Sequence, residues 1–257
     1  MKISVITVNL NNRAGLERTI ASVEAQSCRD FEWIVIDGGS TDGSRELITQ
    51  HADRISYWVS EPDGGIYNGM NKGIRASHGS YLLFLNSGDC LYNKDVLAEV
   101  ELLLQDQDFY VGRIADRAID LKMTDEKDIC SLLTVTSLPH QATFTRRDVF
   151  EKYGMFCEDV LIASDWWLSF NALILGNASI KKLPLVISVY DRNGISSTRS
   201  DLLAAEREKL LSQFPRVQCV SHFYRDNIEI VQALKASRVS FFLFRIYYYL
   251  YRHWLKS

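Results

Sequence analysis

The stretch Tyr81-Leu82-Leu83-Phe84-Leu85-Asn86-Ser87-Gly88-Asp89 runs from an apolar segment directly into a polar turn with a carboxylate at its tip. Residues 81–85 are too few for a helix and lie between two glycines, so we predict a short buried strand. Ligands of open α/β sheets bind just beyond the carboxyl ends of the strands, which is where Asp89 is expected. An acid after a strand is also a common turn former, so a site is indicated only if other polar strand ends accompany it.

The pattern of an apolar strand followed by a polar loop occurs three more times before residue 81. Strands are predicted over residues 3–8, 31–36 and 55–60. Helical segments separate them, and this alternation predicts a mainly parallel sheet with right-handed crossovers. Four polar residues then follow strand ends: Asn9, Asp37, Asp63 and Asp89. They would converge on one edge of the sheet, which four independent surface turns would not explain.

The composition is that of a globular protein with a full core: 257 residues, 47% hydrophobic and 24% charged. A net charge of -3 argues against a nucleic-acid partner, whose phosphates need a basic surface. The five cysteines form no CxxC pair, which argues against a zinc site or a disulfide framework and predicts a reduced, cytoplasmic setting. The first residues enter a strand pattern at once, so no signal peptide is predicted. Neither GxGxxG after a strand nor GxxxxGK[ST] occurs, so dinucleotide and P-loop binding are not supported.

The second half of the chain is predicted to add helices over 96–104, 146–153 and 164–175, and strands over 109–111 and 182–190. Residues 113–135 are mixed and charged, and their pattern predicts no element. Asp165 falls in the first turn of the 164–175 helix, where the helix dipole favours a negative charge. His140 lies in a Pro-His-Gln loop that leads into another short strand.

Four stretches, taken together and in order, resemble the motifs of family 2 glycosyltransferases, which have the nucleotide-sugar-binding GT-A fold. They are Val5-Ile6-Thr7-Val8-Asn9-Leu10-Asn11, Ile36-Asp37-Gly38-Gly39-Ser40-Thr41-Asp42-Gly43, Gly65-Ile66-Tyr67-Asn68-Gly69-Met70-Asn71-Lys72-Gly73 and Phe84-Leu85-Asn86-Ser87-Gly88-Asp89. The resemblance implies an α/β, Rossmann-like GT-A catalytic domain over residues 1–200, followed by a C-terminal helical region over 201–257. Residues 1–92 would form its nucleotide-binding half and residues 93–200 its acceptor half.

The resemblance further implies an inverting transfer of a sugar from a nucleotide-sugar donor, usually a UDP-sugar, to the hydroxyl of a sugar or lipid-linked saccharide. The product class would be a bacterial cell-surface polysaccharide. Donor contacts are implied at Val8, Asn9, Asp37, Asp63, Asn86, Gly88 and Asp89. Asp89 matches the acid that binds a divalent metal, Mn²⁺ or Mg²⁺, and Asp165 matches the catalytic base. Two positions depart from the family pattern, because Gly38 and Gly88 each stand where a further acid is usual.

The chemistry of these residue types agrees with the implied roles. A diphosphate leaving group needs its growing charge neutralised, and a hard divalent cation on a carboxylate such as Asp89 does this. Inversion needs a single base, such as Asp165, to take the acceptor proton. Taken without the resemblance, Asp165 is better explained as a helix-terminal acid of purely structural value, and the resemblance reverses that preference.

Five further residues are candidate acceptor or diphosphate contacts: His140, Trp166, Trp167, Gly194 and Ser196. His140 is also compatible with a purely structural role. The two tryptophans are adjacent, so one of them faces the core and the other is free to contact a sugar ring. Gly194 and Ser196 belong either to a loop that closes over the diphosphate or to a plain surface turn.

The segment 238–256 is rich in aromatic and basic residues. On a helix, Arg238, Arg245 and Arg252 fall on one stripe, and the apolar run is shorter than the roughly 20 residues of a spanning helix. Such a helix suits a membrane interface, which predicts a peripheral location on the inner face of the cell membrane. The alternative is a helix that packs on the catalytic domain or on a second copy of the chain in a homo-oligomer.

Two other function classes remain alternatives. A sugar-phosphate nucleotidyltransferase shares the fold logic, but it normally has a glycine- and basic-rich loop after the first strand, unlike Asn9-Leu10-Asn11-Asn12-Arg13. A non-catalytic nucleotide-sugar-binding or membrane-assembly protein would be favoured by the loss of Asp89 or Asp165. Both acids are present.

Overall fold

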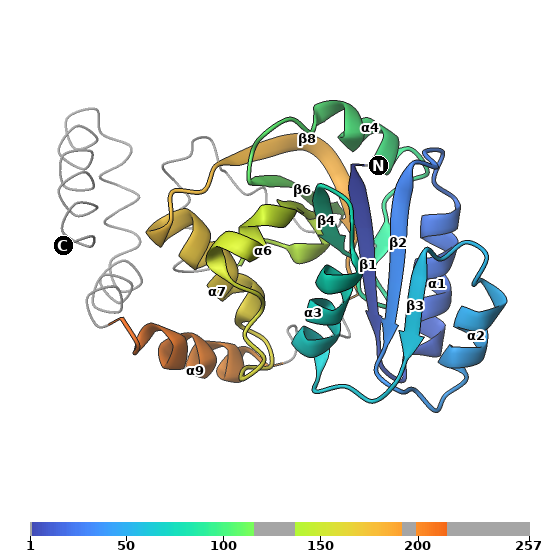
Figure 1. The fold of residues 1–257 in the computed structure, drawn as a ribbon, viewed down its shortest axis with the longest axis horizontal. Coiled ribbons are helices and arrows are strands. Elements are labelled where there is room, and N and C mark those ends of the chain that lie inside the picture. Colours follow the sequence, from blue (N-terminus) through green and yellow to red (C-terminus); the bar gives the residue numbers. More distant parts are fainter. Residues whose placement is uncertain (1, 116–136, 192–198, 215–257) are drawn as a thin grey trace.

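The computed structural model describes residues 2–115, 137–191 and 199–214. These residues form one mixed sheet of eight strands in the order β3-β2-β1-β4-β7-β6-β8-β5, with helices against both faces (Figure 1). The candidate Gly194 and Ser196, most of 113–135 and the whole of 238–256 lie outside the described residues.

The first part of the sheet is parallel, as predicted. It contains β1 (Ile3–Asn9), β2 (Phe31–Asp37), β3 (Tyr57–Ser60) and β4 (Tyr81–Phe84). The connecting helices are α1 (Arg13–Glu24), α2 (Ser44–Gln50) and α3 (Ile66–Ala76). The register aligns Asn9 with Asp37 on β1 and β2. The ends of these strands therefore meet at one edge, which is the condition for the strand-end site predicted above.

Beyond β4 the sheet is mixed. It continues through β7 (Thr143–Arg146), β6 (Phe109–Ala115), β8 (Ile180–Val189) and β5 (Cys90–Leu91). Strand β7 runs antiparallel to both β4 and β6, whereas β8 is parallel to β6 and β5 is antiparallel to β8. The other helices are α4 (Val96–Leu103), α6 (Arg147–Tyr153), α7 (Ser164–Phe170) and α9 (Ser200–Leu211), with a 3-10 turn at His140–Ala142 and a π turn at Asn171–Leu175.

Two apolar clusters cover the two faces of the sheet, because successive side chains of a strand point to opposite faces. On β1, Val5 packs with α1, α2 and α4, whereas Ile6 packs with α3, α6 and α7. Figure 1 shows α1 and α2 on one side of β1–β3 and α3 on the other. The cluster that contains Ile6 lies beneath α3 and α7, which carry part of the candidate site.

Helix α9 belongs to the packed core. Leu210 and Leu211 are buried in the same cluster as residues of α3 and α7. The C-terminal helical region predicted over 201–257 includes nearly all of α9, but the packing of α9 joins this helix to the domain before it. Within the described residues, none of the helices combines the length and apolar character that a membrane span requires.

Candidate active site

A cavity of about 830 Å³ opens at the carboxyl ends of β1 and β4. Among the residues that the sequence predicted, it is lined by Val8, Asn9, Asp63, Asn86, Asp89, His140 and Asp165. The parallel pairing of β1 with β4 brings the first of these together. His140 precedes β7, and Asp165 lies at the start of α7.

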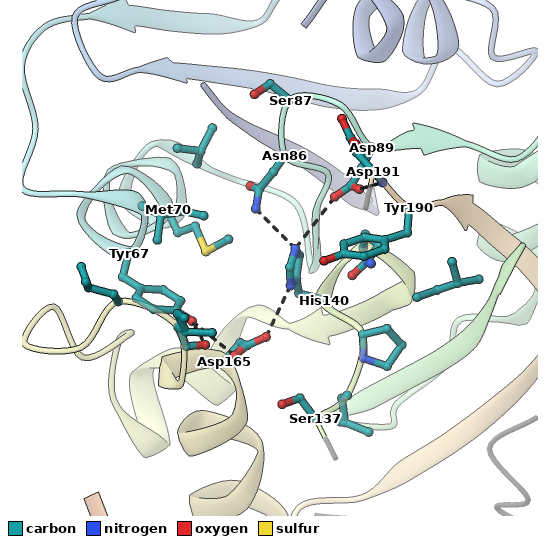
Figure 2. A pocket seen from close by; sticks show the side chains of 18 of the residues that line it. Tyr67, Met70, Asn86, Ser87, Asp89, Ser137, His140, Asp165, Tyr190 and Asp191 are labelled. Atoms are coloured by element: carbon teal, nitrogen blue, oxygen red, sulfur yellow. Dashed lines mark hydrogen bonds and ion pairs between the residues drawn. The ribbon is translucent and has the colours of Figure 1, made fainter. Parts of the chain in front are cut away.

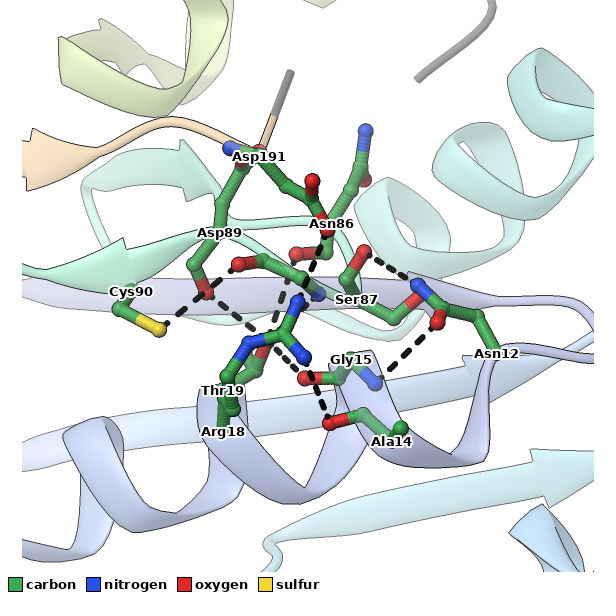
Figure 3. Close-up of polar contacts among 11 residues, drawn as sticks. Asn12, Ala14, Gly15, Arg18, Thr19, Asn86, Ser87, Asp89, Cys90 and Asp191 are labelled. Atoms are coloured by element: carbon green, nitrogen blue, oxygen red, sulfur yellow. Dashed lines mark hydrogen bonds and ion pairs between the residues drawn. The ribbon is translucent and has the colours of Figure 1, made fainter. Parts of the chain in front are cut away.

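The loop that carries Asp89 is fixed against α1 (Figure 3). The Thr19 hydroxyl donates to the carbonyl of Asp89 at 2.8 Å and accepts from the N–H of Gly88 at 2.9 Å. The Asn12 amide caps α1 by accepting from Gly15 at 3.1 Å and donates to the carbonyl of Ser87 at 3.0 Å. The cavity-lining acid is therefore held by a rigid helix rather than by a free loop.

Asp37 is fully buried and does not line the cavity. Its carboxylate accepts hydrogen bonds from the Asn9 amide at 2.7 Å, from the Ser40 hydroxyl at 2.6 Å and from the Ser60 hydroxyl at 2.7 Å. Burial by itself would raise the pKa of Asp37, but these hydrogen bonds outweigh it and lower the pKa. In this structure Asp37 joins the ends of β1, β2 and β3 instead of presenting a free contact for the predicted nucleotide-sugar donor.

The glycine at position 38 leaves room for another acid. A Cβ atom at Gly38 would lie 3.0 Å from Oδ2 of Asp63. The other oxygen of Asp63 accepts from the N–H of Gly65 at 2.9 Å. Asp63 therefore fills the space beside Gly38 and faces the cavity, so a carboxylate is present there despite the departure from the family pattern.

The second departure is compensated in a similar way. Gly88 has φ +105°, and a Cβ atom there would clash with Oδ2 of Asp191. The backbone N–H of Asp191 donates to Oδ1 of Asp89 at 2.9 Å, and Arg18 forms an ion pair with Asp191 at 2.9 Å. Figure 3 shows Asp191 beside Asp89 and Arg18. Gly88, the residue before Asp89, has no carboxylate. Asp191, just after the end of β8, supplies a second carboxylate at this place instead.

His140 lies between the two acids at opposite ends of the cavity (Figure 2). Its Nδ1 is 3.4 Å from Oδ2 of Asp165, while its Nε2 is 3.3 Å from the Asn86 amide and 4.0 Å from Oδ2 of Asp89. Burial would lower the pKa of His140, but the hydrogen bond to Asp165 and the charges of both acids raise it. Burial raises the pKa of Asp89 to about 6, although the charge of His140 opposes this shift.

Asp165 is the second residue of α7, and its carboxylate is oriented from two sides. Oδ1 accepts from the N–H of Trp166 at 2.7 Å and lies 3.3 Å from the Tyr67 hydroxyl, while Oδ2 faces His140. Burial, followed by the charge of Asp165, raises the pKa of Tyr67 well above its usual value, so this hydroxyl remains a donor. The carboxylate therefore has defined partners and one face towards the cavity.

The two tryptophans do not line the cavity. Trp166 is 1% exposed and packs in the core, with the Arg207 guanidinium 4.9 Å from its ring centroid. Trp167 packs on Phe170 and on Phe214 instead. The structure thus does not bring either tryptophan to the cavity, because the rotation of α7 directs Asp165 and not its neighbours towards it.

The cavity wall also contains residues that the sequence reasoning missed: Arg18, Tyr67, Asp191 and Arg207. Asp191 carried a usable signal, since it follows the predicted strand 182–190 as Asp89 follows its own strand. Arg18 and Arg207 carried none, because each is one charged residue on a helix face.

The carboxylate oxygens around Asp89 fit a divalent metal site that uses few protein ligands. Within the described ranges, no group of three or more His, Cys, Asp or Glu side chains is arranged to hold a metal ion. Asp89 and Asp191 nevertheless provide two adjacent carboxylates facing the cavity. Mg²⁺ and Mn²⁺ commonly bind through one or two carboxylates, with phosphate oxygens and water completing the shell.

Comparison with known proteins identifies the family. The family model described as Glycosyl transferase family 2 matches residues 4–154. The chain belongs to this family. A PGL/p-HBAD biosynthesis glycosyltransferase of Mycobacterium bovis is 30% identical over 207 residues, which cover 77% of this chain and 80% of that protein. An uncharacterised glycosyltransferase of Mycobacterium tuberculosis is 34% identical over 206 residues, covering 77% of this chain and 78% of that protein.

Solved structures share the fold of this family 2 glycosyltransferase. Residues 1–349 of S. aureus TarS, in complex with UDP-GlcNAc, match with a TM-score of 0.66 at 18% identity, covering 86% of this chain and 66% of that one. The mannosyltransferase PcManGT from Pyrobaculum calidifontis, in complex with GDP-Man and Mn²⁺, matches with a TM-score of 0.68 at 18% identity, covering 99% and 83%. The predicted α/β GT-A fold is confirmed. The protein is an enzyme, a glycosyltransferase, as predicted.

Proposed function

We propose that this glycosyltransferase transfers a sugar from a nucleoside-diphosphate sugar to an acceptor hydroxyl with inversion at the anomeric carbon, and that the donor is a UDP-sugar. The observation that carries the proposal is the connection of Asp89 and Asp165 through His140 across a single cavity. One end of the cavity has carboxylates suited to a cation and diphosphate, and the other has an oriented carboxylate suited to a base.

The reaction follows from this arrangement. The acceptor oxygen forms a bond to the anomeric carbon while the bond from that carbon to the donor phosphate oxygen breaks on the opposite face. Asp165 takes the proton of the acceptor hydroxyl, and the nucleoside diphosphate leaves with the bonding electrons. A single base suffices for such a displacement. His140 and the N–H of Trp166 hold the Asp165 carboxylate, so that it reaches the acceptor with little reorganisation.

Asp89 and Asp191 are proposed to hold a divalent cation. When bound, the cation neutralises the charge that develops on the leaving diphosphate. Two carboxylates are compatible with Mn²⁺ or Mg²⁺ when phosphate oxygens complete the shell. The ligands bound in the structures of the fold neighbours, UDP-GlcNAc for TarS and GDP-Man with Mn²⁺ for PcManGT, support the same ligand class here.

The wall near Asp165 suggests the class of acceptor. It contains apolar side chains from the segment before α7, from α9 and from the segment before His140: Leu138, Leu161, Ile162 and Leu203. Leu161 is 58% exposed and lines the cavity, so it offers apolar surface to a ligand there. We propose a lipid-linked saccharide of cell-surface polysaccharide synthesis as acceptor. The aromatic and basic segment 238–256 supports a location at the cytoplasmic face of the membrane.

Ligand-dependent thermal stability tests the donor assignment. Purified protein is melted with UDP, GDP, CMP and representative nucleotide sugars, each with and without Mn²⁺. A ligand at 100 times its Kd stabilises by about 2.7 kcal/mol, which raises Tm by roughly 5–10 °C for a domain of this size. We expect such a rise for uridine nucleotides with Mn²⁺. A rise confined to guanosine nucleotides would overturn the UDP assignment, and no rise with any nucleotide would overturn the proposed donor class.

Mn²⁺ binding is expected to weaken as the pH falls through about 6. The raised pKa of Asp89, about 6, means that this carboxyl is ionised above that pH and protonated below it. Protons then compete with the cation, so affinity falls about tenfold for each further pH unit. The measurement is the Kd of Mn²⁺ in the presence of UDP at pH 7.5, 6.5, 5.5 and 5.0, with the metal-free Tm at each pH as control. A Kd that stays constant from pH 7.5 to 5.0 would contradict the role of Asp89.

A further inference from the structure

The segment that leads into Asp165 is held by a buried carboxylate from α9. The N–H of Leu161 donates to Oε1 of Glu206 at 2.6 Å, and the N–H groups of Ile162 and Ala163 donate to Oε2 at 2.8 and 3.0 Å. Glu206 is only 8% exposed. Hydrogen bonds to an ionised acceptor are shorter and roughly twice as strong as neutral ones, so three of them fix this backbone firmly.

The same segment is held from the opposite side. The Tyr67 hydroxyl donates to the carbonyl of Ile162 at 2.5 Å, and the Ser164 hydroxyl accepts from the N–H of Cys157 at 2.5 Å. Ile162 is therefore bound through its N–H by α9 and through its carbonyl by α3. Three residues after Ile162 the chain reaches Asp165, so the position of that carboxylate depends on both contacts.

Glu206 acts at a distance from the cavity. Its neighbour Arg207 lines the cavity wall, whereas Glu206 does not, because its carboxylate is directed at the backbone of residues 161–163. Without the Glu206 carboxylate, the N–H groups of residues 161–163 would lose their hydrogen-bond acceptor. A buried donor without an acceptor costs folding free energy. The segment would then shift, and it would carry the first turn of α7 with it.

We propose that Glu206 is a positioning residue for the catalytic base, which sets the distance between Asp165 and the acceptor hydroxyl. The inference rests on the proposed role of Asp165 as the base. It makes α9 a part of the catalytic apparatus, although this helix lies beyond the residues that the family motifs cover.

The test begins with Glu206→Gln and Glu206→Ala. Glutamine keeps the size and one acceptor oxygen, but its amide nitrogen must face at least one of the three N–H groups. We expect kcat to fall about tenfold in Glu206→Gln and on the order of 100-fold in Glu206→Ala, since a misplacement of about 1 Å can cost that much. The Kd of UDP with Mn²⁺ should stay within twofold, because Asp89 is held by Thr19 and Asp191 and not by residues 161–163. Asp201→Asn, which changes a 76% exposed carboxylate of the same helix, is the matched control and should keep full activity.

A double-mutant cycle with Asp165→Asn separates positioning from general stability. If Glu206 acts through Asp165, Glu206→Ala causes no further loss of the residual rate once Asp165 is replaced. A merely structural role would lower the rate by the same factor in both backgrounds. Hydrogen exchange of the amides of residues 161–163 should also accelerate in Glu206→Gln, but not in Asp201→Asn.

Each outcome separates this inference from the proposed function. Unchanged kcat in folded Glu206→Gln and Glu206→Ala, or equal losses in both backgrounds, would overturn the positioning role while leaving Asp165 as the base. Full activity of Asp165→Asn would overturn the proposed base itself. If Glu206→Ala does not fold, the cycle is completed with Glu206→Gln. A rise in the Tm of this variant with UDP and Mn²⁺ shows that its nucleotide-sugar binding site is intact.

Discussion

Replacing Asp165 by Asn should lower kcat by about 10³-fold while the donor Kd stays within twofold. General base catalysis contributes on the order of 10² to 10⁴ in rate, and the amide cannot take the acceptor proton. Asparagine keeps the shape of the side chain and the oxygen that accepts from the N–H of Trp166. Initial rates of nucleoside diphosphate release measure kcat, and calorimetry with UDP and Mn²⁺ measures donor binding.

Asp159→Asn is the matched control for this variant. Asp159 is an exposed acid shortly before α7 and does not line the cavity, so its loss should leave kcat unchanged. A second readout does not depend on turnover. The hydrogen bond and charge of Asp165 raise the pKa of His140, so Asp165→Asn should lower that pKa, which NMR titration detects. Turnover of Asp165→Asn within a few-fold of the wild type would contradict the role of Asp165 as base.

Replacing Asp89 by Asn should abolish the stabilisation by Mn²⁺ and lower kcat on the order of 10³-fold. A bound cation contributes several kcal/mol of charge stabilisation to the transition state, and each 1.4 kcal/mol is about tenfold in rate. Asp89 is 4% exposed and faces both the cavity and the Asp191 backbone. Calorimetry of Mn²⁺ binding with UDP present tests the loss directly, with no acceptor required.

Asp191→Asn extends the same experiment to the carboxylate that stands beside Gly88. We expect Mn²⁺ affinity to fall about tenfold, because a coordinating charge is lost while Asp89 remains. Asp53→Asn, at an exposed position away from the cavity, is the matched control. Unchanged affinity in Asp191→Asn would confine the metal site to Asp89. Unchanged affinity in Asp89→Asn as well would reject a metal site at this end of the cavity.

Much of the fold could be predicted because its signals are local. Apolar strands followed by polar loops predicted the parallel arrangement of β1 to β4, and the convergence of Asn9, Asp63 and Asp89 follows from that arrangement. Asp37 shows the limit of this reasoning. Like Asn9, Asp63 and Asp89, it lies at or just past the end of a strand, but its carboxylate accepts hydrogen bonds from Ser40 and Ser60 and does not line the cavity.

The antiparallel insertion of β7 between β4 and β6 was not predicted. A strand of four residues carries no signal for the direction of its partner, since pairing depends on contacts between segments far apart in the chain. The orientation of α7 was equally undetermined. Asp165, Trp166 and Trp167 are consecutive, and only the packing of Trp166 in the core decides that Asp165 faces the cavity.

Local patterns and family motifs therefore specified the α/β class and the family, and they marked Asp89 and Asp165 as candidate site residues, because periodicity and short motifs are properties of contiguous residues. Tertiary packing alone placed Asp191 beside Asp89, His140 between the two acids and Glu206 under the segment before Asp165. These contacts join residues that are distant in the chain. Their formation depends on the docking of β8, β7 and α9 against the sheet, which no local pattern encodes.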